Sequence, residues 1–215
     1  MDFALKVLLA YLLGSVVGSL VVGRLRGGVD IRKLGSGNAG STNALRTQGL
    51  AFGTWVIVID VVKGWLAAAW LPGLALPGVA VPTAPMAAWT APACAFAAIA
   101  GHVFPVWHGF RGGKGVATLV GAYAGLQFSL LAPLVTCWLL VVMVSGFVGL
   151  SSIAATLAIP AYLLLRDGGR ITPLLGFALA CAVLVAWTHR GNVRRMRAGT
   201  EPRARKLWLL RRGHT

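Results

Sequence analysis

The sequence predicts an all-α integral membrane protein, a polytopic bundle of about seven transmembrane helices. Of its 215 residues, 57% are hydrophobic and only 12% are charged, and the mean hydropathy is +0.78. Soluble domains carry about 25% charged residues. Apolar runs recur along almost the whole chain and are continuous, whereas the strands of a transmembrane barrel would alternate. These three observations exclude a soluble domain with one anchor.

The apolar runs are separated by prolines, glycines and charges, which mark the expected ends of the spans. The first run is expected to be a retained span, because its basic cluster, Arg24 and Arg26, follows the apolar residues. The stretch 116–147 is too long for one span, so we expect a break near Pro133. The other expected runs cover about 3–23, 50–71, 86–100, a run ending near Arg166, and 171–187.

Three polar segments, 24–49, 101–115 and 188–215, contain all but four of the 20 Lys and Arg residues. Because basic loops favour the cytoplasmic side, we expect these segments and the C-terminus to be cytoplasmic and the N-terminus to lie outside. Seven spans satisfy this arrangement, and five would do so if the middle runs are re-entrant or too short to cross. We expect the whole chain, 1–215, to form a single transmembrane domain.

The net charge of +15 comes from residues that flank apolar runs. This placement favours contact with anionic membrane lipids and disfavours nucleic acid, which would require the charges on a soluble face. The three cysteines, Cys94, Cys137 and Cys181, lie in apolar runs without a Cys-x-x-Cys spacing, so neither a disulfide nor a metal site is expected. We expect no cofactor.

The first polar segment contains GSGNAGSTNALR, residues 35–46. Glycines allow backbone N–H groups to converge on an anion, hydroxyls and amides add donors, and an arginine binds phosphate through two hydrogen bonds. A helix starting near Ser41 or Thr42 would add the positive field of its N-terminus. A flexible loop of ordinary turn residues is the alternative interpretation. The candidate phosphate ligands are Ser36, Asn38, Thr42, Asn43 and Arg46.

The second segment reads GHVFPVWHGFRGGKG, residues 101–115, and precedes a helix expected to start near Val116. Its spacing differs from the nucleotide-binding G-x-x-x-x-G-K-[ST] loop, so phosphate binding without a nucleotide is favoured. The alternative is an interfacial loop at head-group level, which we prefer for Trp107 and His108 and leave open for His102. The candidate ligands are Gly112, Gly113, Lys114 and Gly115.

The third segment, THRGNVRRMRAGTEPR, residues 188–203, follows the last span. His189 and Asn192 are three residues apart and would share one helix face, and histidine is the side chain best able to move a proton near neutral pH. A basic helix that grips anionic lipid is the alternative. Glu201, among many bases, is expected to organise arginines. In the second span, Asp60 and Lys63 are one turn apart, which predicts a mutual ion pair that lines the site.

With these motifs in this order, the chain resembles the bacterial acyl phosphate:glycerol-3-phosphate acyltransferase family (PlsY-type) from about residue 10 to 202. That family also carries D-x-x-K-G in its second span, here Asp60, Lys63 and Gly64. Its Ser-Leu-x-Ser-Ile pattern corresponds to residues 149–153, where Ser152 matches the second serine and Gly149 replaces the first.

The resemblance implies an inner-membrane enzyme that transfers a fatty acyl group from acyl phosphate to the 1-hydroxyl of glycerol 3-phosphate. It would not use acyl-CoA or acyl carrier protein directly, and none of the four histidines has an Asp five residues later, as other glycerol-phosphate acyltransferases have. An acyl-phosphate-forming enzyme would be a functional partner. An organophosphate transporter is the alternative function. The implied catalytic residues are His189, Asn192, Lys114 and Ser152, and the implied substrate-binding residues add Lys63, His102 and Glu201 to the ligands named above.

Overall fold

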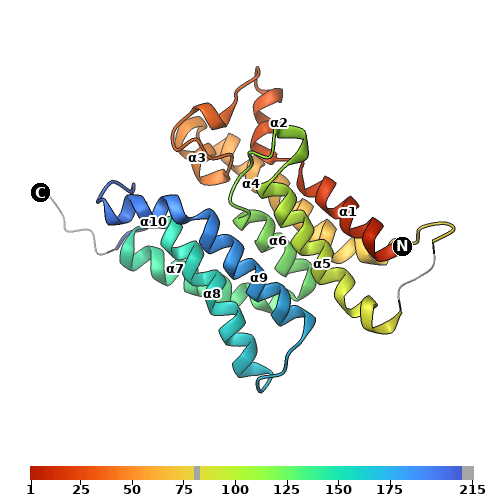
Figure 1. Cartoon of the computed structure of the whole chain (residues 1–215). Coiled ribbons are helices and arrows are strands. Elements are labelled where there is room, and N and C mark those ends of the chain that lie inside the picture. Colours follow the sequence, from red (N-terminus) through yellow and green to blue (C-terminus); the bar gives the residue numbers. More distant parts are fainter. Residues whose placement is uncertain (80–82, 210–215) are drawn as a thin grey trace, which may run out of the picture. The chain divides into compact units, whose positions relative to one another are not determined.

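The computed structural model describes residues 1–79 and 83–209, and within these ranges the chain is helical without a strand. The chain divides into two compact units, Met1–Phe128 and Ser129–Thr215, which are taken in turn (Figure 1). The first unit contains α1 (Asp2–Gly14), α2 (Gly18–Leu25), α3 (Ser41–Gln48), α4 (Leu50–Trp65), α5 (Ala84–Val103) and α6 (Val116–Leu126). The second contains α7 (Leu131–Ser145), α8 (Val148–Arg166), α9 (Pro173–Thr188) and α10 (Arg190–Arg197).

Four helical segments of the described chain are long and apolar enough to cross a bilayer: Leu50–Gly73, Ala84–His108, Phe128–Ser145 and Val148–Arg166. Two bent pairs, α1 with α2 and α9 with α10, raise the number to six if each pair is one span. A seventh would have to be α6, whose 11 residues extend only about 16 Å, roughly half of a hydrocarbon core. The all-helical membrane fold is confirmed, whereas seven spans and the orientation of the termini stay predictions.

One expected helix boundary was wrong. The first apolar run, expected over about 3–23, is a bent pair that breaks at Ser15–Val17, and α1 and α2 differ in direction by 45°. The stretch 116–147 breaks at Gln127, where the backbone is extended, and not at Pro133. Pro133 lies in the first turn of α7, where a proline is tolerated because the N–H groups of that turn have no partner within the helix.

Glycines bring the helices of the first unit into close contact. A Cβ at Gly64 of α4 would run into the Thr118 carbonyl oxygen of α6, and a Cβ at Gly121 of α6 would run into the Val61 carbonyl oxygen of α4. Gly14 of α1 lies in the same way against the backbone of α5. Small residues that let helix backbones touch are typical of membrane helix interfaces.

In the second unit, α8 packs against both α7 and α9. The segment after α10 returns to the C-terminal end of α7, where the N–H groups of Ala204 and Leu209 donate to the carbonyls of Gly146 and Met143 at 2.7 and 2.9 Å. The Arg203 guanidinium stacks on the Trp208 ring, 4.1 Å from its centroid. The last carbonyls of a helix have no partner within the helix. Here the N–H groups of the basic tail are their partners.

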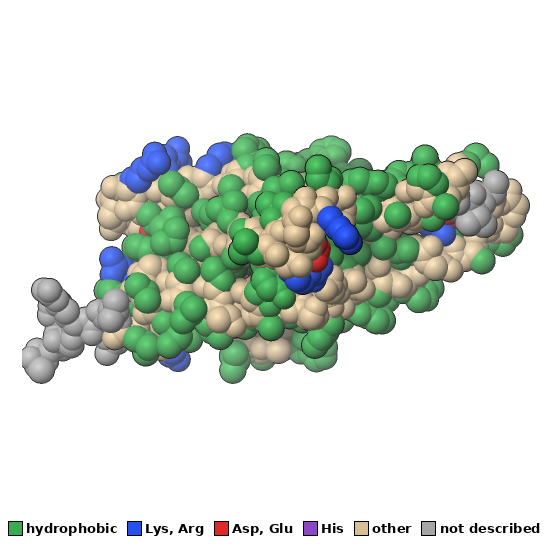
Figure 2. Space-filling model, turned by 90° about the horizontal axis from the view of Figure 1, so that it is seen from below, with side chains coloured by type: hydrophobic (Ala, Val, Ile, Leu, Met, Phe, Trp, Pro, Cys, Tyr) green, Lys and Arg blue, Asp and Glu red, His purple; other side chains and the backbone are tan. Residues whose placement is uncertain are grey.

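Hydrophobic side chains cover much of the face seen in Figure 2, and Lys and Arg side chains are confined to separate groups. Large apolar residues are exposed on several helices, among them Trp55 at 59%, Leu140 at 59% and Val183 at 71%. Exposed apolar surface of this extent is expected of helices that face lipid.

Candidate active site

Asn43 organises the glycine-rich loop before α3. The helix begins at Ser41, as the sequence predicts, and the Asn43 side chain turns back into the loop and is 3% exposed. Its Nδ2 donates to the carbonyls of Leu34, Asn38 and Ile31 at 2.9 to 3.1 Å, and its Oδ1 accepts the Ser36 N–H at 3.0 Å. The amide is therefore occupied by the loop it shapes.

The remaining candidates of this loop lie nearer to its surface. Ser36 and Arg46 are exposed, and Asn38 and Thr42 are half-buried. Asn43 holds Ser36 through its backbone N–H.

The second loop is anchored on the last turn of α5. Gly113 donates its N–H to the His102 carbonyl at 3.1 Å, and Gly112 donates to the Val103 carbonyl at 3.2 Å. A Cβ at Gly112 would run into the His102 carbonyl oxygen, and one at Gly113 would run into the His102 ring. Glycine is required at both positions because the loop backbone lies directly on the helix end.

The loop then turns into α6, which begins at Val116 as predicted. Gly115 has a φ of +84°, in the left-handed region that favours glycine. Lys114 is half-buried between two buried glycines, Gly113 and Gly115. A backbone that carries a lysine into the N-terminus of a helix is an arrangement that attracts anions.

Arg32, three residues before the loop at 35–46, contacts the segment 101–115 within the first unit. Its Nη1 donates to the His108 carbonyl at 3.0 Å, and its Nε and Nη2 donate to the two carboxylate oxygens of Asp30 at 3.0 Å each. The side-chain hydrogen bond from Arg32 lowers the pKa of the Asp30 carboxyl. The sequence pattern gives no sign of this contact, because Arg32 is one of five basic residues in the polar segment 24–49.

The predicted ion pair between Asp60 and Lys63 is present, at 2.8 Å, and it is fully enclosed. Lys63 Nζ also donates to the Val16 carbonyl at 2.7 Å and lies 2.8 Å from His102 Nδ1. The exposed fractions of Asp60, Lys63 and His102 are 1, 3 and 2%. The three side chains form one buried cluster between α4, α5 and the break in the first span.

In the second unit, His189 lies at the bend between α9 and α10 and is 4% exposed. Its Nδ1 is 2.8 Å from the Val185 carbonyl oxygen. A carbonyl oxygen can only accept, so Nδ1 carries the hydrogen and Nε2 is the acceptor nitrogen of the neutral ring.

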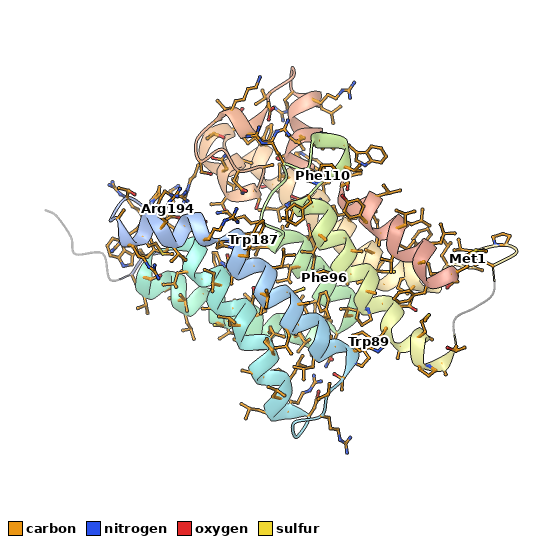
Figure 3. The ribbon with its side chains drawn as sticks, viewed as in Figure 1. Met1, Trp89, Phe96, Phe110, Trp187 and Arg194 are labelled. Carbon is orange, nitrogen blue, oxygen red and sulfur yellow. The ribbon has the colours of Figure 1, made fainter. Side chains whose placement is uncertain are left out.

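Glu201 orients Asn192. Asn192 Nδ2 donates to Glu201 Oε1 at 2.6 Å, and Arg195 Nε donates to Oε2 at 2.6 Å. The Glu201 side chain is 4% exposed, so a buried carboxylate sets the direction of one amide and one guanidinium. Glu201 thus organises an arginine, as expected from its position among bases. Figure 3 shows Trp187 on the last turn of α9 and Arg194 on α10 in this unit, and Phe110 beyond the C-terminal end of α5 in the first unit.

Residues 149–153 form the start of α8. Gly149 packs against Asn192, and a Cβ at 149 would lie 2.9 Å from the Asn192 Cβ, so a serine there would require Asn192 to shift. Ser152 is 3% exposed, donates to the Val148 carbonyl at 2.9 Å, and accepts from Trp138 Nε1 at 3.3 Å.

No group of three His, Cys, Asp or Glu side chains that could hold a metal ion occurs in residues 1–79 and 83–209.

The predicted site residues fall into two sets, one in each unit. In the first unit, Arg32 joins the segment before the loop at 35–46 to the segment 101–115. In the second unit, Asn192 and Glu201 are hydrogen-bonded, and His189 lies at the bend before α10.

The comparisons with known proteins agree over almost the full chain. The family model described as "Glycerol-3-phosphate acyltransferase" matches residues 4–199. The glycerol-3-phosphate acyltransferase of Thioalkalivibrio sulfidiphilus is 41% identical over 197 residues, which cover 92% of this chain and 91% of that protein. The enzyme of the same name from Sinorhizobium medicae is 39% identical over 194 residues, covering 90% and 88%.

Two solved structures of PlsY (YgiH), an integral membrane glycerol 3-phosphate acyltransferase, share the fold. The glycerol 3-phosphate form is 32% identical with a TM-score of 0.80, covering 94% of this chain and 96% of that one. The lysophosphatidic acid form is 31% identical with a TM-score of 0.79, covering 96% and 98%. None of these relatives favours the transporter alternative. The chain belongs to the glycerol-3-phosphate acyltransferase family.

Proposed function

We propose that this enzyme transfers a fatty acyl group from an acyl phosphate to the 1-hydroxyl of glycerol 3-phosphate, which yields 1-acylglycerol 3-phosphate (lysophosphatidate) and inorganic phosphate. Membership of the family and the neighbours solved with glycerol 3-phosphate and lysophosphatidic acid support it. The observation that carries the proposal is the hydrogen bond from Arg32, three residues before the loop at 35–46, to the His108 carbonyl in the segment 101–115. Both substrates carry a phosphate, and these loops offer donors for phosphate.

The loop at 112–115 is proposed to hold phosphate through its backbone amides, the N-terminus of α6 and the Lys114 ammonium. Ser36, Asn38, Thr42 and Arg46 are proposed to hold the other phosphate or its neighbouring hydroxyl. Asn43 would act indirectly, because its amide is already engaged with the loop backbone. Which loop holds which phosphate is decided by measuring the KM of each substrate in Arg46→Met and Lys114→Met.

The chemistry needs no covalent enzyme intermediate, because an acyl phosphate is an activated mixed anhydride. The C1 hydroxyl oxygen of glycerol 3-phosphate would attack the acyl carbonyl carbon. The new C–O ester bond forms, the bond between the acyl carbon and the phosphate oxygen breaks, and phosphate leaves with its electron pair. Donors around Lys114 would neutralise charge on the leaving phosphate, which lowers the barrier.

His189 is the candidate base for the hydroxyl proton, because its Nδ1 is fixed on Val185 and its Nε2 is therefore the acceptor. The phosphate of the substrate itself is the competing base. If Nε2 takes the proton, His189→Gln lowers kcat by about 100-fold or more, within the range of general-base contributions. If the substrate phosphate takes it, kcat stays near the wild-type value. Asn192 would position the substrate hydroxyl. Ser152 would hold the start of α8 in position.

We further propose that the enzyme lies in the bacterial inner membrane with its active site on the cytoplasmic side and its N-terminus outside. The distribution of Lys and Arg over the polar segments supports this orientation. In that place it would meet membrane lipids, and an acyl-phosphate-forming enzyme would supply its donor.

The deciding experiment uses the purified chain with palmitoyl phosphate and labelled glycerol 3-phosphate, with acyl-CoA as the alternative donor. Labelled lysophosphatidate with palmitoyl phosphate, and none with acyl-CoA, is the expected result. Uptake of the label into proteoliposomes without acyl transfer would point to transport and would overturn the proposal.

A further inference from the structure

The cluster of Asp60, Lys63 and His102 does more than line a site. We propose that these three are positioning residues, which hold the two phosphate-binding loops of the first unit in register and do not themselves contact substrate. This inference rests on the proposed function, since it concerns how those loops are held.

The hydrogen bonds of Lys63 carry the argument. Its Nζ lies 2.8 Å from Asp60 Oδ1, 2.7 Å from the Val16 carbonyl oxygen and 2.8 Å from His102 Nδ1. An ammonium group has three hydrogens and no acceptor, so with His102 Nδ1 as the unprotonated ring nitrogen these three contacts use all of its donors. The same Nδ1 lies 3.3 Å from Asp60 Oδ1, so the ring contacts both members of the ion pair. A substrate phosphate would have to displace one of these buried partners.

One side of the cluster holds the break in the first span. The break at Ser15–Val17 frees backbone groups that a continuous helix would satisfy, and inside a membrane such groups need partners from the protein. Lys63 Nζ donates to the Val16 carbonyl, and Asp60 Oδ1 accepts from the Gly18 N–H at 3.1 Å. Gly18 is the first residue of α2, and α2 leads into the segment that contains residues 35–46. The charged pair therefore fixes the helix that introduces the first loop.

The other side of the cluster holds the second loop. The His102 ring receives Lys63, and the His102 carbonyl receives the Gly113 N–H at 3.1 Å. A Cβ at Gly113 would run into the same ring, so the loop backbone lies against the imidazole just before Lys114. A shift of the ring would move the loop. Asp60, Lys63 and His102 thus join the helix before one loop to the backbone of the other.

A second buried pair in the same unit provides a matched control. Lys6 Nζ lies 3.0 Å from Asp2 Oδ2 and donates to the Pro72 carbonyl at 2.8 Å. Both side chains are nearly as buried as Asp60 and Lys63, at 7 and 5% exposed. This pair also ties a helix to a backbone carbonyl, but it contacts neither loop.

The test is a double-mutant cycle with Asp60→Asn, Lys63→Gln and the combined variant, measured as kcat and KM for glycerol 3-phosphate in purified, folded enzyme. We expect each single change to lower kcat/KM by about tenfold or more, and the combined variant to be no worse than either single change, because residues that act as a unit are not additive. Asp2→Asn with Lys6→Gln should lower the thermal midpoint and leave kcat and KM within about twofold of wild type.

Three outcomes would overturn the proposal: wild-type kinetics in Asp60→Asn, losses that multiply in the combined variant, and equal kinetic losses in the control pair. Multiplying losses would mean that Lys63 contacts substrate independently of Asp60. A single change can leave an uncompensated buried charge, so that the protein does not fold. The neutral combined variant then decides alone: a loss of kcat/KM of about tenfold supports the proposal, and wild-type kinetics overturn it. A wild-type enzyme that makes no lysophosphatidate would refute the proposed function instead.

Discussion

Single buried side chains in this protein act mainly on other protein groups. The Asn43 amide is hydrogen-bonded to the loop backbone, and the Glu201 carboxylate accepts from Asn192 and Arg195. The Lys63 ammonium group contacts three neighbouring protein groups. Each is polar and nearly buried, so each must be satisfied by the protein in order to be tolerated. At this scale, the three polar groups hold other parts of the protein in place.

Glu201 gives the first prediction at the residue scale. Glu201→Gln keeps the shape but replaces one acceptor oxygen with an NH2 group, so either Asn192 or Arg195 loses its partner. We expect kcat/KM to fall by about tenfold or more and the free energy of unfolding to fall by about 1–3 kcal/mol. Enzyme assays and thermal unfolding of the purified variant measure both.

Asp167→Asn is the control for Glu201→Gln, because Asp167 is also a carboxylate paired with an arginine, here the neighbouring Arg166, in the same unit. It should change neither quantity. Full activity in Glu201→Gln would refute the orienting role.

Phe110 gives the second prediction at this scale. It is the one described residue other than glycine with a positive φ, +58°, and its side chain is 58% exposed. The left-handed conformation costs a non-glycine residue roughly 1–2 kcal/mol. Phe110→Gly is therefore expected to raise the thermal midpoint, whereas Trp107→Gly, exposed in the same loop without a positive φ, should not. An unchanged or lower midpoint in Phe110→Gly would show that the aromatic ring contributes more than the backbone loses.

At the scale of helices, close packing depends on glycine. Gly121 lies where a Cβ would run into the Val61 carbonyl oxygen, so Gly121→Ala must push α6 away from α4. Overpacking of this kind costs about 1–3 kcal/mol. We expect a lower thermal midpoint and lower activity, because α6 begins directly at the loop that holds Lys114.

Gly73→Ala is the matched control for Gly121→Ala, because a Cβ at Gly73 meets nothing within 4 Å and its φ is not positive. Its thermal midpoint should equal that of the wild type. If Gly121→Ala melts at the wild-type temperature as well, the α4–α6 interface is not as tight as the structure has it.

The short and broken helices are a second feature at this scale. The bends at Ser15–Val17 and at His189, and the extended residue Gln127, each interrupt an apolar run that its composition would allow to continue. Two of these interruptions lie beside polar clusters, at Lys63 and at His189 itself. Non-helical backbone at membrane depth is tolerated where protein groups satisfy it, and here they do.

At the scale of the whole molecule, the central prediction concerns topology. In a variant whose three native cysteines are replaced, single cysteines at Ser36, Arg111 and Arg203 should react with a membrane-impermeant thiol reagent only from the cytoplasmic side. A cysteine at Gly168, in the turn after α8, should react only from outside. The reason is the asymmetric distribution of Lys and Arg. Labelling of Ser36 and Arg203 from opposite sides would contradict the cytoplasmic active site.

The sequence by itself determined the class of the molecule and most of its parts. Continuous apolar runs require helices in a bilayer, because only helices satisfy their own backbone groups there. The starts of α3 and α6 and the ion pair of Asp60 with Lys63 also follow from local residue order, since partners one turn apart must meet on a helix.

The tertiary structure alone decided which groups far apart in the chain the polar side chains touch. Lys63 meets Val16, 47 residues away, and His102, 39 residues away, and Arg32 meets His108, 76 residues away. No local pattern encodes such contacts, because they depend on how helices far apart in the chain pack. The type of a residue determines how many hydrogen bonds its side chain can make, but only the fold determines which partners form them.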